Sequence, residues 1–487
     1  MGRYRQYQTA AACSLGSLVM GLLNVWPSYT TSLYTSQNTT LLVEPMTEFH
    51  ASLLGSLPSL GAMIGTAITS LVIDRLGRKH GGVLLSLPYV LCWALKEVCT
   101  SSQLILMARF LGGVAGGSAL VYAPIFISEI AESSVRGTLA AGPMIFYSLG
   151  ALFSYIIGWT CDFRTITYMN LAVSVVNAIF ISVVVESPVY LLKKNREEDA
   201  RNAIAQYRGA STESKEVLEE LSRLKQQLMP AVEMITVSQA ADPESKGDDP
   251  EKEKLNINTD SVVYEDRTKT PAWKLLFVSP STRRAMMVVG VTLTLQVFMG
   301  MVTVQVNAKE LFARAAPSLS SHLCSVLFAL ILLVGCTFTA TFADKSGRRV
   351  LILTSSALVA VCMAALGFLM QTQLGPPLLT AVVMLVYCFC FSFGSGTVPY
   401  VLLAECFNSE VQGIASMLLV EWVWFLNFFI IAVFPYVTAV VGTHGVFYFY
   451  ACVAVGDCII SYFIVPETKG LTLDEIQEAL LYSPKKK

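Results

Sequence analysis

The chain has 487 residues, of which 54% are hydrophobic and only 14% are charged, and its formal net charge is −1. Soluble domains average about 25% charged residues, so this composition excludes an ordinary soluble protein. A net charge this close to zero also gives no reason to expect a nucleic-acid partner. We therefore expect an integral membrane protein.

Long apolar stretches occupy most of the chain. A membrane-spanning helix needs about 20 mostly apolar residues. Six such stretches come before a long polar segment, and they cover Thr9–Leu33, Leu53–Ile73, Gly82–Thr100, Leu104–Ile127, Leu139–Trp159 and Ile166–Val185. Six more follow it, and they cover Met286–Phe312, His322–Phe342, Val350–Met370, Pro377–Leu403, Ile414–Val437 and Val446–Val465. The pattern predicts an all-α integral membrane protein with 12 transmembrane helices in two pseudo-symmetric halves.

A short charged segment separates the second and third stretches. Asp74–Lys79 reads DRLGRK, and Asp344–Arg349 reads DKSGRR at the matching place in the second half. Charge at this density cannot lie in lipid, so each segment is predicted to be a tight aqueous turn. The repeat indicates that the two halves arose by duplication.

Lysine and arginine residues gather on one side of the predicted membrane. That side receives both charged turns, Arg136, Lys193 and the basic C-terminal tail, and the opposite side receives few basic residues. By the positive-inside rule the basic side is cytosolic, which places both termini in the cytosol. We expect the protein to lie in the plasma membrane. The loop from Thr35 to His50 is then external, and its Asn38 begins a glycosylation sequon.

The polar segment between the halves is expected to contain short cytosolic helices. In Glu197–Leu228 an apolar stripe at helical spacing is formed by Val217, Leu221, Leu224 and Leu228. Ala240–Lys254 is rich in charged residues and predicted to be disordered. We divide the chain into residues 1–190, 191–280, 281–470 and 471–487, and interpret 191–280 as a tether, with a regulatory platform as the alternative.

Charged residues ring the predicted cytosolic face of both halves. They are interpreted as a gate of ion pairs, with interface anchoring as the alternative. The predicted gate residues are Asp74, Arg78, Arg109, Glu129, Arg136, Glu186, Asp344, Arg348, Glu405 and Glu467. In the first half, Asp74 and Arg78 are expected to pair with Arg136 and Glu129. Such pairs would separate as the cytosolic side opens.

Other residues inside the apolar stretches suggest close packing of helices or contact with a substrate. Gly113 and Gly117 have the small-xxx-small spacing that lets two helices approach closely. The tenth stretch is interrupted by glycine and proline just before Tyr400, as in segments that move or line a substrate path. Glu421 is an acid inside the membrane and therefore a functional candidate, although it could instead bond a neighbouring helix. Asp457 is also an acid inside the membrane, and it too is either a functional residue or a residue that bonds a neighbouring helix.

Enzyme chemistry is not indicated. The 12 cysteines are scattered and form no CxxC pair, and we find no nucleophile–base arrangement, phosphate-cradling glycine loop or metal-ligand spacing. We expect no metal, no cofactor and no catalytic activity.

Several motifs together give a family resemblance. The chain resembles the sugar porters of the major facilitator superfamily over nearly its whole length. The matching segments are the two charged turns, Arg109–Gly137 with Pro124 and Glu129, Glu186–Pro188, and Pro466–Gly470. The region of Trp26 and Gly55–Leu57 is most similar to trehalose and hexose facilitators of arthropods.

The resemblance implies alternating access around a sugar that is bound between the halves. The positions that match the family's sugar site, or that line the same cavity, are Gln296, Gly300, Tyr400, Glu421, Trp424 and Asn427. Some amides of the family are replaced here by Met144, Val297 and Val302, which weakens the expectation of an ordinary hexose.

The energy source is also suggested by the resemblance. Proton-driven relatives carry an acid in the first span, where this chain has Leu23 and Asn24. That difference favours facilitated diffusion of a sugar or a related polar solute. A proton-coupled carrier of another organic solute and a non-transporting nutrient sensor remain the alternatives.

Overall fold

The computed structural model describes residues 2–132, 134–228, 272–471 and 473–481, and within them the regular structure is helical. The first half, called the N half, contains α1 (Gly2–Val25), α2 (Pro27–Thr35), α3 (Glu48–Leu76), α4 (Arg78–Val98), α5 (Ser102–Ile130), α6 (Arg136–Ala140), α7 (Gly142–Thr160) and α8 (Phe163–Val183). Three short helices follow it: α9 (Pro188–Lys193), α10 (Glu197–Arg208) and α11 (Lys215–Leu228).

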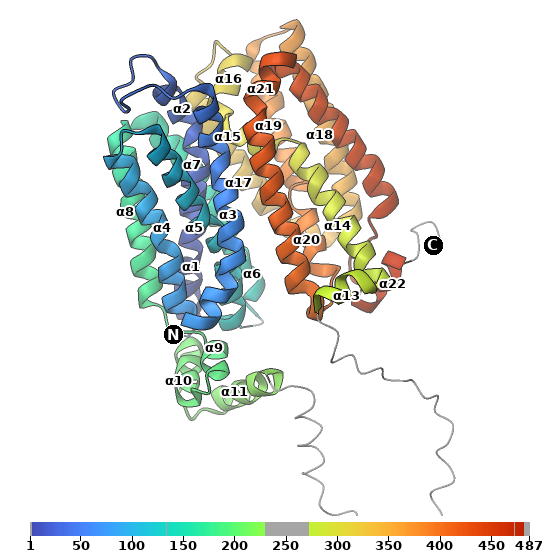
Figure 1. Ribbon diagram of the computed structural model, residues 1–487. Helices are drawn as coiled ribbons and strands as arrows, with labels where there is room; N and C mark the ends of the chain where they lie inside the picture. Colours follow the sequence, from blue (N-terminus) through green and yellow to red (C-terminus); the bar gives the residue numbers. More distant parts are fainter. Residues whose placement is uncertain (1, 133, 229–271, 472, 482–487) are drawn as a thin grey trace, which may run out of the picture.

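The second half, called the C half, repeats this plan. It contains α13 (Ala272–Val278), α14 (Pro280–Phe298), α15 (Met301–Val306), α16 (Ala308–Ala315), α17 (Ser321–Ser346), α18 (Arg348–Thr372), α19 (Pro377–Phe393), α20 (Val398–Glu405), α21 (Ser409–Ile464) and α22 (Leu473–Leu481). Figure 1 shows the halves as two bundles side by side. We call the end that carries the start of α1, α9–α11 and α22 the termini end, and the opposite end the far end.

The described helices provide 11 segments long and apolar enough to cross a membrane. The last of them, α21, has 56 residues, and Gly442 inside it has the non-helical angles φ 76° and ψ 161°. A straight helix of that length would be about 84 Å long, whereas a bilayer core is about 30 Å thick. The bend at Gly442 turns α21 back on itself, so it supplies both the eleventh and the twelfth predicted span.

Close packing of α3 on α5 depends on glycine at both helices. A Cβ on Gly113 or Gly117 would lie 2.1 or 2.2 Å from the carbonyl oxygens of Pro58 and Ala62 in α3. A Cβ on Gly61 of α3 would likewise lie 2.1 Å from a carbonyl oxygen of α5. The small-residue spacing therefore brings the two backbones together, as the sequence predicted.

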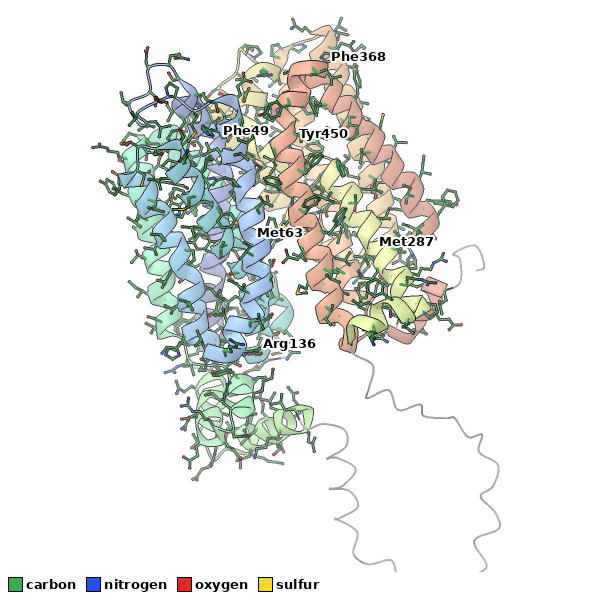
Figure 2. All side chains as sticks on the ribbon, in the orientation of Figure 1. Phe49, Met63, Arg136, Met287, Phe368 and Tyr450 are labelled. Atoms are coloured by element: carbon green, nitrogen blue, oxygen red, sulfur yellow. The ribbon has the colours of Figure 1, made fainter. Side chains whose placement is uncertain are left out.

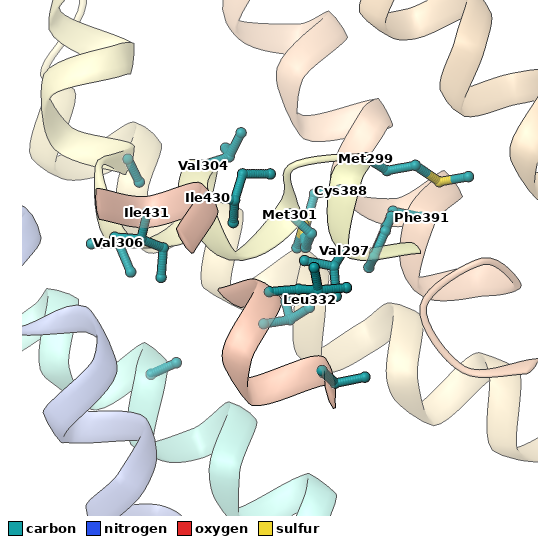
Figure 3. Close-up of a cluster of buried hydrophobic side chains, with 14 of the residues drawn as sticks. Val297, Met299, Met301, Val304, Val306, Leu332, Cys388, Phe391, Ile430 and Ile431 are labelled. Atoms are coloured by element: carbon teal, nitrogen blue, oxygen red, sulfur yellow. The ribbon is translucent and has the colours of Figure 1, made fainter. Parts of the chain in front are cut away.

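The seventh and tenth predicted spans are broken helices. The seventh breaks at Gly300, whose φ of +81° is left-handed, between α14 and α15. The break lies in a cluster of buried apolar side chains from α14, α15, α17, α19 and α21 (Figure 3). Tyr387 of α19 donates a hydrogen bond of 3.0 Å to the carbonyl of Met299, which satisfies a backbone group that the break leaves free. The tenth span breaks at Gly394–Thr397, between α19 and α20.

Helices α9–α11 pack under the N half. Val217, Leu221 and Leu224 of the predicted stripe are buried against α9 and α10, and Leu228 is 37% exposed. Arg208 of α10 donates to the carbonyl of Ile130 at 3.0 Å. The predicted disordered stretch Ala240–Lys254 lies outside the described residues.

The two halves meet mainly toward the far end. Helix α3 packs on α21 and α7 packs on α17, while α1 and α2 contact α15. Tyr155 donates a 2.6 Å bond to the carbonyl of Gln305, and the amide of Lys309 donates a 3.0 Å bond to Ser28. In Figure 2, Met63 lies on the side of α3 that faces the C half, and Arg136 lies at the termini end.

Candidate functional site

The break in the seventh span places Gln296 beside the tenth span. Its Nε2 donates a 3.1 Å hydrogen bond to the carbonyl of Gly396, which is free because the tenth span is also interrupted there. The Tyr400 hydroxyl lies near Gln296 and near Tyr147 of the N half. Tyr400 is 42% exposed although it belongs to an inner segment. Both side chains therefore face the space between the halves.

Helix α21 contributes a polar face to the same space. Glu421 accepts a hydrogen bond from Thr66 of α3, so this pair joins the two halves directly. Asn427 is 6% exposed, and neither its Oδ1 nor the Nε1 of Trp424 has a partner in the described protein. Residues three apart on a helix share a face, so Glu421, Trp424 and Asn427 line one side of α21.

Asp457 has a different environment from Glu421. Its carboxylate accepts hydrogen bonds from Ser356 and, at 3.2 Å, from Ser461. These partners belong to α18 and α21, both in the C half, and Asp457 is 1% exposed. This acid ties two helices together, as in the packing interpretation.

Gln305 is a site residue that the sequence analysis missed. It lies on α15, three residues beyond Val302 and hence on the same face. Its Oε1 accepts a 3.4 Å bond from Tyr147, which in turn accepts a 3.2 Å bond from Asn24. The signal was present, because Gln305 is the only amide in the apolar run Met301–Val306. The amide absent at Val302 is thus supplied one helical turn later.

Unpartnered polar atoms indicate what this space can bind. Buried atoms without a hydrogen-bond partner in the described protein include Gln296 Oε1, Gln305 Nε2, Trp424 Nε1 and Asn427 Oδ1. Buried polar groups are nearly always hydrogen-bonded, so each exception needs an explanation. The set mixes donors and acceptors and carries no charge, and hydroxyl groups can both donate and accept. The arrangement suits a neutral, hydroxyl-rich solute.

A second space lies between the halves at the far end. It is a cavity of about 440 Å³, lined by residues of both halves that include Thr31, Ser52, Asn307 and Glu310. Glu310 forms a 2.6 Å ion pair with Arg314 at its rim. This polar groove lies on the same side of the bundle as the main contacts between the halves.

The charged turn of the N half is held by a network around Arg78. Its guanidinium binds Glu129 at 2.6 and 2.9 Å and Asp74 at 3.1 Å, and its side chain is only 3% exposed. The carboxylate of Glu186 accepts bonds from the backbone amides of Arg78 at 2.8 Å and Lys79 at 3.1 Å. The α3–α4 turn is thereby fixed to the end of α5 and to the start of α9.

The C half repeats this network. Arg348 binds Glu405 at 2.8 Å, and Glu467 accepts a 2.9 Å bond from the backbone amide of Arg348. Thr468 donates a 2.6 Å bond to Glu405, as Ser187 does to Glu129 in the N half. The side chain of Asp344 is not among those that the structure describes. Each network joins elements of its own half, so in this conformation the bonds named here do not cross between the halves.

Two predicted gate residues do not join these networks. Arg136 does not pair with Asp74; it donates a 3.3 Å bond to the carbonyl of Ala131. Arg109 lies seven residues after the start of α5, toward the far end, and donates to the carbonyls of Leu54 and Leu23 at 2.8 and 2.6 Å. The spans alternate in direction, so α5 begins at the far end, and Arg109 lies on the side of the bundle opposite the charged turns.

Arg109 shares its surroundings with a second buried cation. Lys96 is 2% exposed, and its Nζ lies 3.6 Å from the ring centre of Trp93 and 4.1 Å from that of Trp26. Arg109 is fully buried 5.6 Å from the same Trp26 ring. Cation–π contacts compensate part of the cost of removing these charges from water.

The comparison with protein families gives a match over most of the chain. A family model described as "Sugar (and other) transporter" matches residues 13–241 and 235–480. The facilitated trehalose transporter Tret1 of Polypedilum vanderplanki is 24% identical over 98% of this chain and 88% of its own length. Tret1 of Bombyx mori is 25% identical over 98% of this chain and 87% of its own length.

Solved structures share the fold. The xylose transporter XylE from E. coli, in a partially occluded inward open conformation, superposes with a TM-score of 0.73 at 21% identity, covering 96% of this chain and all of that one. Its inward open conformation gives a TM-score of 0.73 at 20% identity, covering 97% and 99% of the two chains. A third structure, of the major facilitator superfamily proton:xylose symporter XylE, gives a TM-score of 0.70 at 20% identity, so this chain shares its fold.

Proposed function

Because the chain belongs to the sugar (and other) transporter family, we propose that it carries a sugar of the trehalose or hexose class, or a related polar solute, across the plasma membrane by facilitated diffusion. The single observation behind the choice of solute is the uncharged set of unpartnered donors and acceptors on Gln296, Gln305, Trp424 and Asn427. Relatives whose names state trehalose transport support the sugar class.

The proposed mechanism is rocking of two rigid bodies, residues 1–190 and 281–470. The Arg78 and Arg348 networks would keep each body rigid, since each network is internal to one half. The bonds from Tyr155 to Gln305 and from Lys309 to Ser28 would break when the far end opens. With the termini end in the cytosol, the conformation described here would be the one that faces inward.

An uptake panel tests this function. We expect saturable uptake of at least one sugar among trehalose, glucose and fructose in oocytes, unchanged by an imposed proton gradient. Uptake only under an inward proton gradient would favour the proton-coupled carrier. Binding without any flux, together with signalling that is lost on deletion of Ala240–Lys254, would identify a nutrient sensor instead.

The solute contact of Gln296 can be tested by substitution. Gln296→Leu removes an amide that can make two solute bonds, each with a net contribution of about 0.5–1.5 kcal/mol, so we expect the apparent solute affinity to fall about tenfold. Solute titration of uptake measures this change. The matched control is Gln103→Leu, at an exposed position near the start of α5, which should leave the affinity unchanged. Equal effects at the two positions would remove Gln296 from the site.

Proton coupling can be tested at Glu421. Glu421→Gln keeps an oxygen that can accept the hydrogen bond of Thr66 but cannot be charged. Facilitated diffusion predicts that this variant transports within about twofold of the original protein, because the bond to Thr66 is kept and no proton has to be carried. Uptake should be measured across a range of external pH. Loss of transport at every pH, with normal surface expression, would argue for a titrating role.

The proposed orientation can be tested through Asn38. This residue is exposed in the loop between α2 and α3 at the far end, where glycosylation requires an external location. We expect Asn38→Gln to remove a glycosidase-sensitive shift in electrophoretic mobility while uptake stays normal. If wild-type protein made in insect cells shows no such shift, this site offers no support for the proposed orientation.

A further inference from the structure

A cavity of about 780 Å³ lies at the termini end, where α10 packs beneath the N half. We call it the junction pocket. It is lined by parts of α1, the α3–α4 turn, α9 and α10, and so by three separate regions of the sequence. Its size is within the range of small-molecule sites, about 300–1,000 Å³. It is far along the bundle from the space that Gln296 and Gln305 line.

Basic side chains outnumber acidic side chains among the residues that line the junction pocket. Four basic side chains line the junction pocket: Arg5, Lys79, His80 and Arg196. Of its two acids, Asp199 is paired with Arg196 at 2.8 Å, and Glu186 accepts the backbone amides at the start of α4. Arg5 bonds only the neutral Gln206 among the described residues. The side chains of Lys79 and His80 form no hydrogen bond or ion pair within the described part of the chain.

The binding of Glu186 shows that this end of α4 accepts an anion. Backbone amides at a helix start point outward and favour negative charge. With Asp199 paired to Arg196, Arg5 and Lys79 provide two positive charges against the single carboxylate of Glu186, and His80 offers a further donor. A phosphate monoester carries about −1.5 to −2 charges and three acceptor oxygens, which matches this set better than a single carboxylate.

We propose that the junction pocket binds a ligand bearing a phosphate monoester, held by Arg5, Lys79 and His80. The ligand would bridge α1, the α3–α4 turn and α10. It would therefore clamp the helices after the N half onto the charged turn that Arg78 organises. This phosphate could belong to a lipid headgroup at the membrane surface or to a soluble nucleotide, and the chemistry of recognition is the same for both.

Binding can be measured on the full chain in phosphatidylcholine nanodiscs. One arm adds a minor fraction of phosphatidylinositol phosphate to the lipid, and the other adds AMP, a soluble phosphate monoester, to the solution. The signal is the rise in the midpoint of thermal unfolding with ligand concentration. A rise in the lipid arm alone identifies a headgroup site, and a rise with AMP identifies a soluble ligand; either outcome supports the proposal.

Two double variants test whether the phosphate binds in the junction pocket. Lys79→Gln combined with His80→Gln should weaken binding at least about tenfold, because charge-assisted bonds to phosphate are lost. The control combines Lys193→Gln and Lys194→Gln, which remove charge from the same end but do not line the pocket. The control should bind within about twofold of the original protein. No rise in either arm, or equal weakening in both variants, would overturn the proposal.

Discussion

Replacing Arg78 with alanine is expected to abolish most transport and to lower the free energy of unfolding by about 3–5 kcal/mol. The guanidinium binds Glu129 and Asp74 and also donates a 3.2 Å bond to the carbonyl of Ile73, in a nearly buried position. Removing it leaves the 12% exposed carboxylate of Glu129 without its counter-charge. An uncompensated buried charge costs far more than a surface ion pair contributes.

The matched control for Arg78 is its neighbour Arg75. Arg75 lies in the same turn and carries the same charge, but its side chain is exposed. Arg75→Ala should therefore change the unfolding free energy by less than about 1 kcal/mol. Thermal unfolding of purified protein and uptake in vesicles measure both variants. If Arg78→Ala behaves like Arg75→Ala, the network does not hold the turn.

The C half offers an internal comparison for the same network. Arg348 and Glu405 are more exposed than their counterparts, with side-chain exposures of 13% and 26% against 3% and 12%. Solvent screens the second pair better, so its loss should cost less.

Replacing Gly300 with alanine is expected to destabilise the protein by about 3 kcal/mol and to remove most transport. Its φ of +81° is unfavourable for a residue with a Cβ. That Cβ would also lie 2.3 Å from the ring of Tyr450, which is 2% exposed and cannot easily move aside. The break between α14 and α15 would have to shift, and with it the positions of Gln296 and Gln305.

Gly290 provides the control for this substitution. It lies in α14, where a Cβ would meet only Leu419 at 3.4 Å, an ordinary contact. Gly290→Ala should be neutral, or stabilising by up to about 1 kcal/mol, because alanine favours the helix. A Gly300→Asn variant separates the effect of the left-handed backbone angle from the effect of the clash with Tyr450. Asparagine tolerates the left-handed region, but its Cβ would still meet the Tyr450 ring. If Gly300→Ala had the full stability and transport of the original protein, the prediction that the helix break requires glycine at this position would be wrong.

Much of the architecture could be predicted from the sequence. The apolar stretches, the duplicated charged turns and the family motifs led to an all-helical membrane protein with two related halves, which the match to XylE supports. The apolar stripe of Val217, Leu221 and Leu224 was read from spacing alone. These features are local or repeated, so their physical cause is contained within a short run of residues.

The site was only partly predictable. Gln296, Trp424 and Asn427 were selected from the family resemblance and Tyr400 from the interruption before it, and the structure brings Gln296 and Tyr400 together. Gln305 was missed because its role depends on Tyr147 and Tyr155, which lie more than a hundred residues earlier in the chain. Arg109 was predicted at the wrong end because it was grouped with the other charged residues of its span, although the alternating direction of the spans puts the start of the fourth span on the predicted external side.

From the sequence alone it follows that the chain spans a membrane, that its halves are related and that its turns are charged. The bilayer thickness sets the length of each apolar stretch, and the cost of charge in lipid keeps the charged residues in the turns, so both act on each segment separately. Only the tertiary structure decided which atoms meet. The breaks at Gly300 and Gly394–Thr397 place Gln296 against the carbonyl of Gly396, and the packing of α7 on α17 brings Tyr147 to Gln305. Such contacts depend on the positions of several helices at once, and no single stretch of sequence contains that information.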